Sequence, residues 1–207
     1  MARALQRVPV AAGTLPEGPY WDGVAGGLYW VDIPAGRVHF LDESGGQRTW
    51  AAGQPVAAAA GRAGGGLALA VRDGFAALDL ATGQTSVLAG VEPDRPDNRM
   101  NDGACDRAGR FFAGTKAEDD APGAGALYRL DPDHVVTLVV ADVTISNGIG
   151  WSPDEQLMYY VDSPTRRIDV FDYDPASGAI GGRRPFARLP SGLSFPRLKP
   201  ARNRRWQ

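Results

Sequence analysis

The chain has 207 residues, of which 43% are hydrophobic and 22% are charged, a composition typical of a folded globular protein rather than a disordered chain. Its net charge of −2 does not predict binding to nucleic acid or to an anionic membrane, and no segment approaches the ~20 apolar residues of a membrane span. The single cysteine, Cys105, excludes an intramolecular disulfide. The N-terminal residues lack the apolar core of a signal peptide, so we expect a cytoplasmic protein.

Short apolar segments bounded by Gly, Pro, Asp or Asn recur along the chain and predict β-strands rather than helices. The main strand of each unit is predicted at residues 28–31, 67–71, 111–113 and 157–161. A second strand follows each of them, at residues 38–42, 75–79, 126–131 and 168–172. Short glycine-containing turns join the first two pairs and indicate β-hairpins, whereas a longer loop is predicted at residues 115–125 in the third pair.

The spacing of these units indicates a β-propeller. The main strands begin 39, 44 and 46 residues apart, and a repeat of about 40–45 residues with several strands per unit is typical of propeller blades. A β-sandwich would show frequent turns without this repeat, and a β-helix would have a much shorter period. We therefore predict an all-β propeller.

The number of units and the end of the chain indicate an incomplete propeller. Four units are recognisable, the last ending near Asp174, and a further strand begins at residues 184–189. Residues 194–207 show no strand pattern and contain basic residues without any acid, namely Arg197, Lys199, Arg202, Arg204 and Arg205. We expect a partial propeller of about four blades over residues 1–193 and a disordered basic tail over residues 194–207.

Three polar segments precede main strands and stand outside the repeat: residues 15–21, 98–103 and 145–151. Each lies roughly 10–12 residues before its strand, so their side chains are expected at the same end of the central channel. Oxygen donors without histidine or sulfur suit a hard cation such as Ca²⁺, Mg²⁺ or Mn²⁺. The alternatives are simple turns at the Asn-Gly and Asp-Gly steps, a surface acid at Glu17 and a local ion pair at Arg99.

At these segments the sequence resembles the gluconolactonase and regucalcin family, also called the senescence marker protein family. LPEGPYWDGVAGGLYWVDIPAGRVHFLD, DNRMNDGACDRAGRFFAGTK and ISNGIGWSPDEQLMYYVDSPTRRIDVFDYDPASG carry the resemblance, which runs from about residue 13 to residue 193. The resemblance implies a six-bladed propeller with one divalent cation on its axis, usually Ca²⁺ or Zn²⁺, and hydrolysis of sugar lactones.

The resemblance also implies a set of site residues. Glu17 and Asn147 match two protein ligands of the metal, and Arg99 and Asn101 match a substrate-binding pair. Asp119 lies where some members place a substrate-contacting Glu.

The sequence departs from the family pattern near its end. The third metal ligand, an Asp in a Pro-Asp-Gly step that is also the general base, has no counterpart, because the chain reads PSGLSFPR from residue 190 and contains no acid after Asp174. We expect no catalytic base in this chain and a C-terminally truncated family member whose ending resembles a reading-frame shift. Lactone turnover by the 207 residues is expected to be weak or absent.

Three functions remain open. The first is a lactonase acting on a small-molecule sugar lactone, impaired by the missing base. The second is a non-catalytic propeller fragment that binds a divalent metal or a sugar. The third is an unstable fragment with exposed sheet faces. The sequence does not distinguish the lactone, the metal or the oligomeric state.

Overall fold

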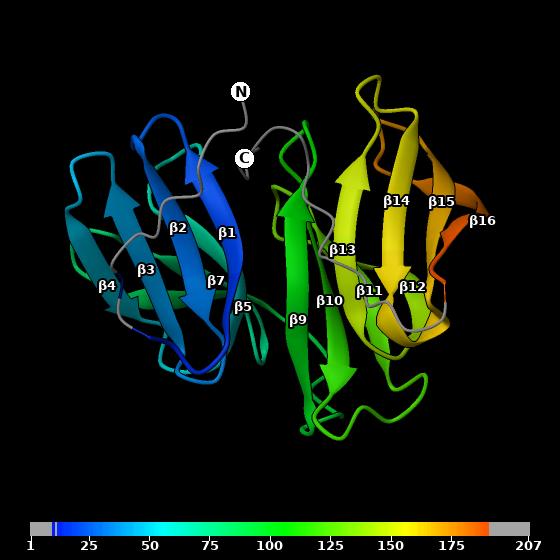
Figure 1. Ribbon diagram of the computed structural model, residues 1–207, viewed down its shortest axis with the longest axis horizontal. Helices are drawn as coiled ribbons and strands as arrows, with labels where there is room; N and C mark the ends of the chain where they lie inside the picture. Colours follow the sequence, from blue (N-terminus) through cyan, green and yellow to red (C-terminus); the bar gives the residue numbers. More distant parts are fainter. Residues whose placement is uncertain (1–9, 11, 191–207) are drawn as a thin grey trace.

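The computed structural model describes residues 10 and 12–190, and these residues form an all-β protein. They contain sixteen strands in four antiparallel sheets of four strands each, and a single turn of 3₁₀-helix. Figure 1 shows the first sheet (blue) at the left of the molecule and the last sheet (yellow to orange) at the right. The predicted all-β fold built from repeated units of several strands is confirmed, and each unit is a four-stranded sheet. No helix in the described part of the chain is long and apolar enough to cross a membrane.

The strands of each sheet pair in the order of the sequence. Sheet 1 contains β1 (Pro16–Asp22), β2 (Gly27–Asp32), β3 (Arg37–Asp42) and β4 (Gln47–Ala51). Sheet 2 contains β5 (Val56–Gly61), β6 (Leu67–Val71), β7 (Gly74–Leu78) and β8 (Thr85–Gly90). Sheet 3 contains β9 (Asn98–Cys105), β10 (Phe111–Ala117), β11 (Gly125–Leu130) and β12 (Val136–Val143). Sheet 4 contains β13 (Ser146–Trp151), β14 (Leu157–Asp162), β15 (Arg167–Tyr173) and β16 (Ile180–Arg188), with the 3₁₀-helix η1 (Ser163–Thr165) between β14 and β15.

The predicted hairpins correspond to the two central strands of each sheet, from β2–β3 in sheet 1 to β14–β15 in sheet 4. Two predictions are corrected. The three polar segments do not stand outside the repeat, because they contain the first strands β1, β9 and β13. The fourth unit does not end near Asp174, because the further strand expected at residues 184–189 is β16, which pairs with β15 as the fourth strand of sheet 4.

One internal loop differs from its prediction, and the predictions for the end of the chain are not tested. The predicted loop at residues 115–125 is shorter than expected because β10 continues to Ala117 in pairing with β9. The expected basic tail at residues 194–207, and its boundary at residue 193, lie outside the described residues. The expected total of six blades therefore remains a prediction.

The turn between the third and fourth strands has the same construction in several sheets. Asp42, Asp79 and Asp174 follow or end the third strand, and each carboxylate accepts main-chain N–H groups from the turn. Asp42 also accepts the Ser44 hydroxyl at 2.6 Å, and this bond, followed by that of the Gly46 N–H, lowers the pKa of Asp42. An aspartate at or just after the end of the third strand thus begins the turn in sheets 1, 2 and 4.

The hydrophobic core lies between successive sheets rather than at one centre. Tyr29, Val31 and Leu69 belong to a cluster built from sheets 1 and 2. Phe75 and Phe111 pack edge-to-face between sheets 2 and 3, with ring centroids 5.6 Å apart. A third cluster, from sheets 3 and 4, contains Phe112, Trp151 and Tyr160. Each sheet therefore buries a face against its neighbour in sequence, which is the packing that a propeller requires.

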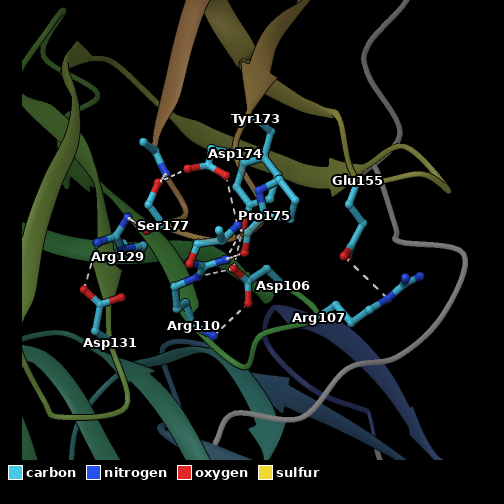
Figure 2. Close-up of polar contacts among 12 residues, drawn as sticks. Asp106, Arg107, Arg110, Arg129, Asp131, Glu155, Tyr173, Asp174, Pro175 and Ser177 are labelled. Atoms are coloured by element: carbon cyan, nitrogen blue, oxygen red, sulfur yellow. Dashed lines mark hydrogen bonds and ion pairs between the residues drawn. The ribbon is translucent and has the colours of Figure 1, made fainter.

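Sheets 3 and 4 are also joined by a buried ionic cluster, which Figure 2 shows in close-up. Arg110, in the β9–β10 turn, donates from Nε to Asp106 Oδ2 at 2.5 Å and from Nη2 to Tyr173 Oη at 2.9 Å. The Tyr173 hydroxyl in turn donates to Asp106 Oδ2 at 2.5 Å. The guanidinium also reaches the main-chain oxygens of Pro175 and Ala176 in the β15–β16 turn, at 2.7 and 3.1 Å. One arginine thus attaches a turn of sheet 3 to a turn of sheet 4.

The side chains of this cluster are almost fully removed from water, with 6% of Arg110 and 1% of Asp106 exposed. Burial, together with the hydrogen bond to the ionised Asp106, raises the pKa of Tyr173, which therefore stays protonated and donates. The charged groups have partners in good geometry, as a buried ion pair requires. This cluster sets the position of sheet 4 relative to sheet 3, and the candidate site lies between those two sheets.

Candidate functional site

The residues expected in the site occupy equivalent positions on the first strands of the sheets. Glu17, Arg99 and Asn147 are each the second residue of their strand, in β1, β9 and β13. The equivalent residue of β5 is Ala57, so sheet 2 contributes no polar group at this position. The first strands pack in the order β1, β5, β9 and β13. The equal distance in the sequence between each polar segment and its main strand thus corresponds to equivalent positions of these residues in their sheets.

An irregularity in strand pairing lies near the start of every first strand, including β5, which carries no polar group at the equivalent position. In β1 the register shifts between Glu17 and Tyr20, and in β13 it shifts between Asn147 and Ile149. In β9 the bulge leaves Asn101 without a paired residue on β10. A bulge bends the strand and re-aims its side chains, and bulges are frequent beside functional sites.

Three of the expected site residues form one hydrogen-bonded array between sheets 3 and 4. Arg99 Nη1 donates to the main-chain oxygen of Met100 at 2.9 Å and to Asn101 Oδ1 at 3.0 Å. Asn101 Nδ2 donates across the interface to the main-chain oxygen of Ser146 at 2.8 Å and to Asn147 Oδ1 at 3.1 Å. Residues 46 positions apart in the sequence, Asn101 and Asn147, are therefore direct neighbours.

The array continues at both ends to residues that the sequence did not single out. Arg99 Nε donates to Glu118 at 3.2 Å, and Glu118 also accepts a bond from Arg72 of the β6–β7 turn at 2.5 Å. At the other end, Asn147 Nδ2 donates to Ser163 Oγ at 2.8 Å. Arg99 and its partners thus connect sheet 2, sheet 3 and sheet 4.

The spacing of the repeat would have identified Arg72, Glu118 and Ser163, because they occupy equivalent positions in three sheets. In every sheet, the residue after the second strand donates its N–H to the main-chain oxygen of the residue that precedes the first strand. This position is occupied by Ile33, Arg72, Glu118 and Ser163. The motifs that stand out in the sequence lie on the first strands alone, so this second position of the repeat was not predicted.

Asp102 supports Asn147 through the main chain. Its Oδ2 accepts the N–H of Gly148 at 2.9 Å, and its Oδ1 accepts the N–H of Gly103 at 2.9 Å. Gly148 has a φ of 69°, a left-handed conformation that residues with a side chain adopt only at some cost. The carboxylate therefore holds the bulge in β13 that carries Asn147.

Glu17 and Asp119 lie in other surroundings. Glu17 is half-buried and lines a cavity of about 290 Å³ on sheet 1, whose other walls are mainly apolar and include Leu28 and Trp30. Asp119 is exposed in the turn after β10, where its Oδ1 accepts the N–H of Ala121 at 3.0 Å. The acid that contacts Arg99 is Glu118, its neighbour in sequence. The roles expected for Glu17 and Asp119 remain predictions.

The donor atoms fit a hard cation in kind but are few in number. Asn147 Oδ1 is an amide oxygen that accepts one hydrogen bond from Asn101 and has a second lone pair, and Glu17 supplies a carboxylate. Within residues 10 and 12–190, no group of three or more His, Cys, Asp or Glu side chains comes together. A cation held by Glu17 and Asn147 would therefore take most of its ligands from water or substrate.

Gly114 permits the close approach of β10 and β13 at this site. A methyl group at Gly114 would lie 2.5 Å from Ser146 Cβ and closer still to Ser146 Oγ, next to the carbonyl that Asn101 binds. We expect Gly114→Ala to lower the free energy of unfolding by about 1–3 kcal/mol, the usual cost of overpacking. Urea unfolding measures this change, with Gly150→Ala as control, because a methyl group there meets no atom within 4 Å. Equal stability of the two variants would contradict the close packing.

Residues 15–197 match the protein family described as the SMP-30/Gluconolactonase/LRE-like region. The chain is 41% identical over 186 residues to regucalcin of Homo sapiens and 40% identical over 186 residues to regucalcin of Bos taurus. Each of these alignments covers 87% of this chain and 62% of the relative. The chain therefore spans less than two thirds of the length of the curated relatives that it matches.

Solved structures show the same similarity. A calcium-binding protein, regucalcin, from Agrobacterium tumefaciens superimposes with a TM-score of 0.81 at 31% identity, covering 85% of this chain and 60% of that one. A luciferin-regenerating enzyme gives a TM-score of 0.79 at 32% identity, covering 84% and 60%. A gluconolactonase from Xanthomonas campestris gives 0.72 at 28% identity, covering 87% and 65%. From its sequence motifs, its four-stranded sheets and these matches, the chain belongs to the SMP-30/gluconolactonase/LRE-like family.

Proposed function

We propose that this chain carries the substrate-binding part of a metal-dependent sugar-lactone hydrolase. The observation that supports this proposal is the array of Arg99, Asn101 and Asn147, which brings hydrogen-bonding groups from two sheets together. One of the solved structures that are similar to this chain is a gluconolactonase. Asp119, on the exposed turn beside Glu118, completes the proposed substrate-binding set.

Arg99 has donors left for a ligand. Its Nε and Nη1 groups bind Glu118, Met100 and Asn101, whereas Nη2 donates none of the hydrogen bonds found among the described residues. Two N–H groups can therefore reach the oxygen atoms of a sugar lactone. Asn101 directs both of its N–H groups to Ser146 and Asn147, so it joins the two sheets as well as lining the site.

The proposed cation would be held by Glu17 and Asn147, and when bound it would supply Lewis-acid polarisation of the lactone carbonyl. Ca²⁺ or Zn²⁺ is the proposed metal, and Mg²⁺ or Mn²⁺ also suits these oxygen donors. Hydrolysis further requires a base that removes a proton from the attacking water. The sequence has no Asp or Glu after Asp174, where the family motif would supply that base. We therefore propose binding with impaired turnover.

The second candidate is a divalent-metal or sugar binder without catalysis. It is favoured by the small number of acidic ligands that come together in the described part of the chain. Both candidates predict that a ligand binds at the array, and they differ in whether a lactone is hydrolysed. A single set of measurements on the 207-residue chain distinguishes them.

We expect the chain to hydrolyse gluconolactone weakly or not at all above the uncatalysed rate in the presence of Ca²⁺, Zn²⁺ or Mn²⁺. Titration calorimetry with the same cations is expected to show binding that Glu17→Gln weakens, since the substitution removes a charged oxygen donor. Glu43→Gln, an exposed acid in the β3–β4 turn, is the control. Robust metal-dependent turnover would contradict the impairment, and equal cation affinity of wild type and Glu17→Gln would exclude Glu17 as a ligand.

A further inference from the structure

A directional chain of hydrogen bonds runs from Arg99 through Asn101 and Asn147 to Ser163. The donor atoms in this order are Arg99 Nη1, Asn101 Nδ2 and Asn147 Nδ2, and the final acceptor is Ser163 Oγ. The three steps measure 3.0, 3.1 and 2.8 Å. They join β9 to β13 and then β13 to η1, the short helix that follows β14.

The direction of this chain follows from the chemistry of its members. A guanidinium can only donate, so Asn101 must turn its amide oxygen toward Arg99. The main-chain oxygen of Ser146 can only accept, so the Asn101 amino group must face the opposite side. Because that amino group also contacts Asn147, Asn147 must present its oxygen to Asn101 and its own amino group to Ser163. The residue that follows Asn147 in this chain must therefore accept a hydrogen bond, and the Ser163 hydroxyl does so.

Ser163 is held in place independently of the side chain that it contacts. Its N–H donates to the main-chain oxygen of Ile145 at 3.0 Å, immediately before β13. The preceding residue, Asp162, accepts the N–H groups of Thr144 and Ile145 at 3.1 and 2.9 Å. Pro164 follows within η1 and restricts the backbone of the turn. The backbone that carries the Ser163 hydroxyl is therefore held in place beside Asn147.

We propose that Ser163 is a positioning residue that sets the orientation of the Asn147 amide, with the amide oxygen on the side of Asn101 and the amino group away from the site. This inference deepens the proposed function and rests on it only where ligand binding is concerned. Asn147 can offer an oxygen to a cation, or to a donor group of a substrate, only in this orientation. If the amide rotated by half a turn, its amino group would face both Asn101 and the bound cation, and both contacts would be repulsive.

The orientation can be observed without any ligand. In Ser163→Ala the Asn147 amino group loses its acceptor, so the side-chain ¹⁵N–¹H₂ resonances of Asn147 are expected to shift. Ser163→Thr retains a hydroxyl and is expected to preserve them. Ser44→Ala removes a hydroxyl from an exposed turn of sheet 1 and is the matched control. If Ser163→Ala does not fold, Ser163→Cys, whose thiol is a weak acceptor, gives the same measurement. Unchanged Asn147 resonances would overturn the proposal.

Ligand binding tests the consequence for function. Replacing a group that orients a metal ligand costs about 10–100-fold in affinity, so Ser163→Ala is expected to weaken Ca²⁺ or Mn²⁺ binding by that factor in calorimetry. Ser163→Thr and Ser44→Ala are expected to bind as wild type does. Equal affinity of Ser163→Ala and wild type would overturn the positioning role. A wild-type chain that binds neither cation nor lactone would refute the proposed function, while the Asn147 resonances would still decide the role of Ser163.

Discussion

Replacing Arg110 with methionine is expected to lower the free energy of unfolding by about 3–5 kcal/mol, the usual cost of breaking a buried ion pair from one side. The Asp106 carboxylate is 1% exposed and would lose its cation, keeping the Tyr173 hydroxyl and the main-chain N–H of residue 110 as donors. The main-chain oxygens of Pro175 and Ala176 would lose their donor at the same time. Urea unfolding followed by tryptophan fluorescence measures this change, since Trp151 packs 5.9 Å from the Tyr173 ring.

The control is Arg184→Met. Arg184 pairs with Asp172 at 2.9 Å, but its side chain is 47% exposed, so its removal is expected to change stability by no more than about 0.5 kcal/mol. The double variant Asp106→Leu/Arg110→Met removes both charges and is expected to recover part of the loss. A loss at Arg110→Met no larger than at Arg184→Met would show that the cluster does not hold sheets 3 and 4 together.

Replacing Arg99 with methionine is expected to weaken the binding of a sugar lactone by roughly ten- to a hundred-fold. Hydrogen bonds to a charged group contribute about 1.5–3 kcal/mol each, and 1.4 kcal/mol corresponds to a tenfold change in affinity. The substitution removes the Nη2 donors, which have no hydrogen-bond acceptor among the described residues, and also the bond that orients Asn101. Titration of the ¹⁵N-labelled chain with freshly dissolved gluconolactone measures the affinity from the shifts of main-chain amides in β9 and β13.

Arg95→Met is the matched control for this prediction. Arg95 lies on the loop before β9 and donates to the main-chain oxygen of Ala124 at 2.8 Å, outside the array. Its loss is expected to leave lactone affinity unchanged. Arg99→Lys separates charge from geometry, because lysine keeps the positive charge but cannot donate to Glu118 and Asn101 from one planar group. Wild-type affinity in Arg99→Met would remove Arg99 from the proposed binding set.

The parts of the fold that were predictable are those with a strong local pattern. The central strands of each sheet, such as β2 and β14, are apolar and end in an aspartate, so they were found at nearly their observed positions. The outer strands β4 and β8 were not predicted, because they are largely exposed and carry no clear alternation of apolar and polar residues. β16 was predicted only in part, as a further strand at residues 184–189, and nothing local in the sequence indicates which strand it pairs with.

By itself, the sequence determined the strand repeat, the all-β class and the equivalent positions of Glu17, Arg99 and Asn147, because the spacing of apolar residues and turns directly reflects local backbone geometry. Only the tertiary structure decided which side chains meet. The partners Asn101–Asn147, Arg99–Glu118 and Arg110–Tyr173 lie in different strands, turns or sheets. Such contacts depend on the angle and distance at which the sheets pack, and these follow from the whole interface rather than from any local segment.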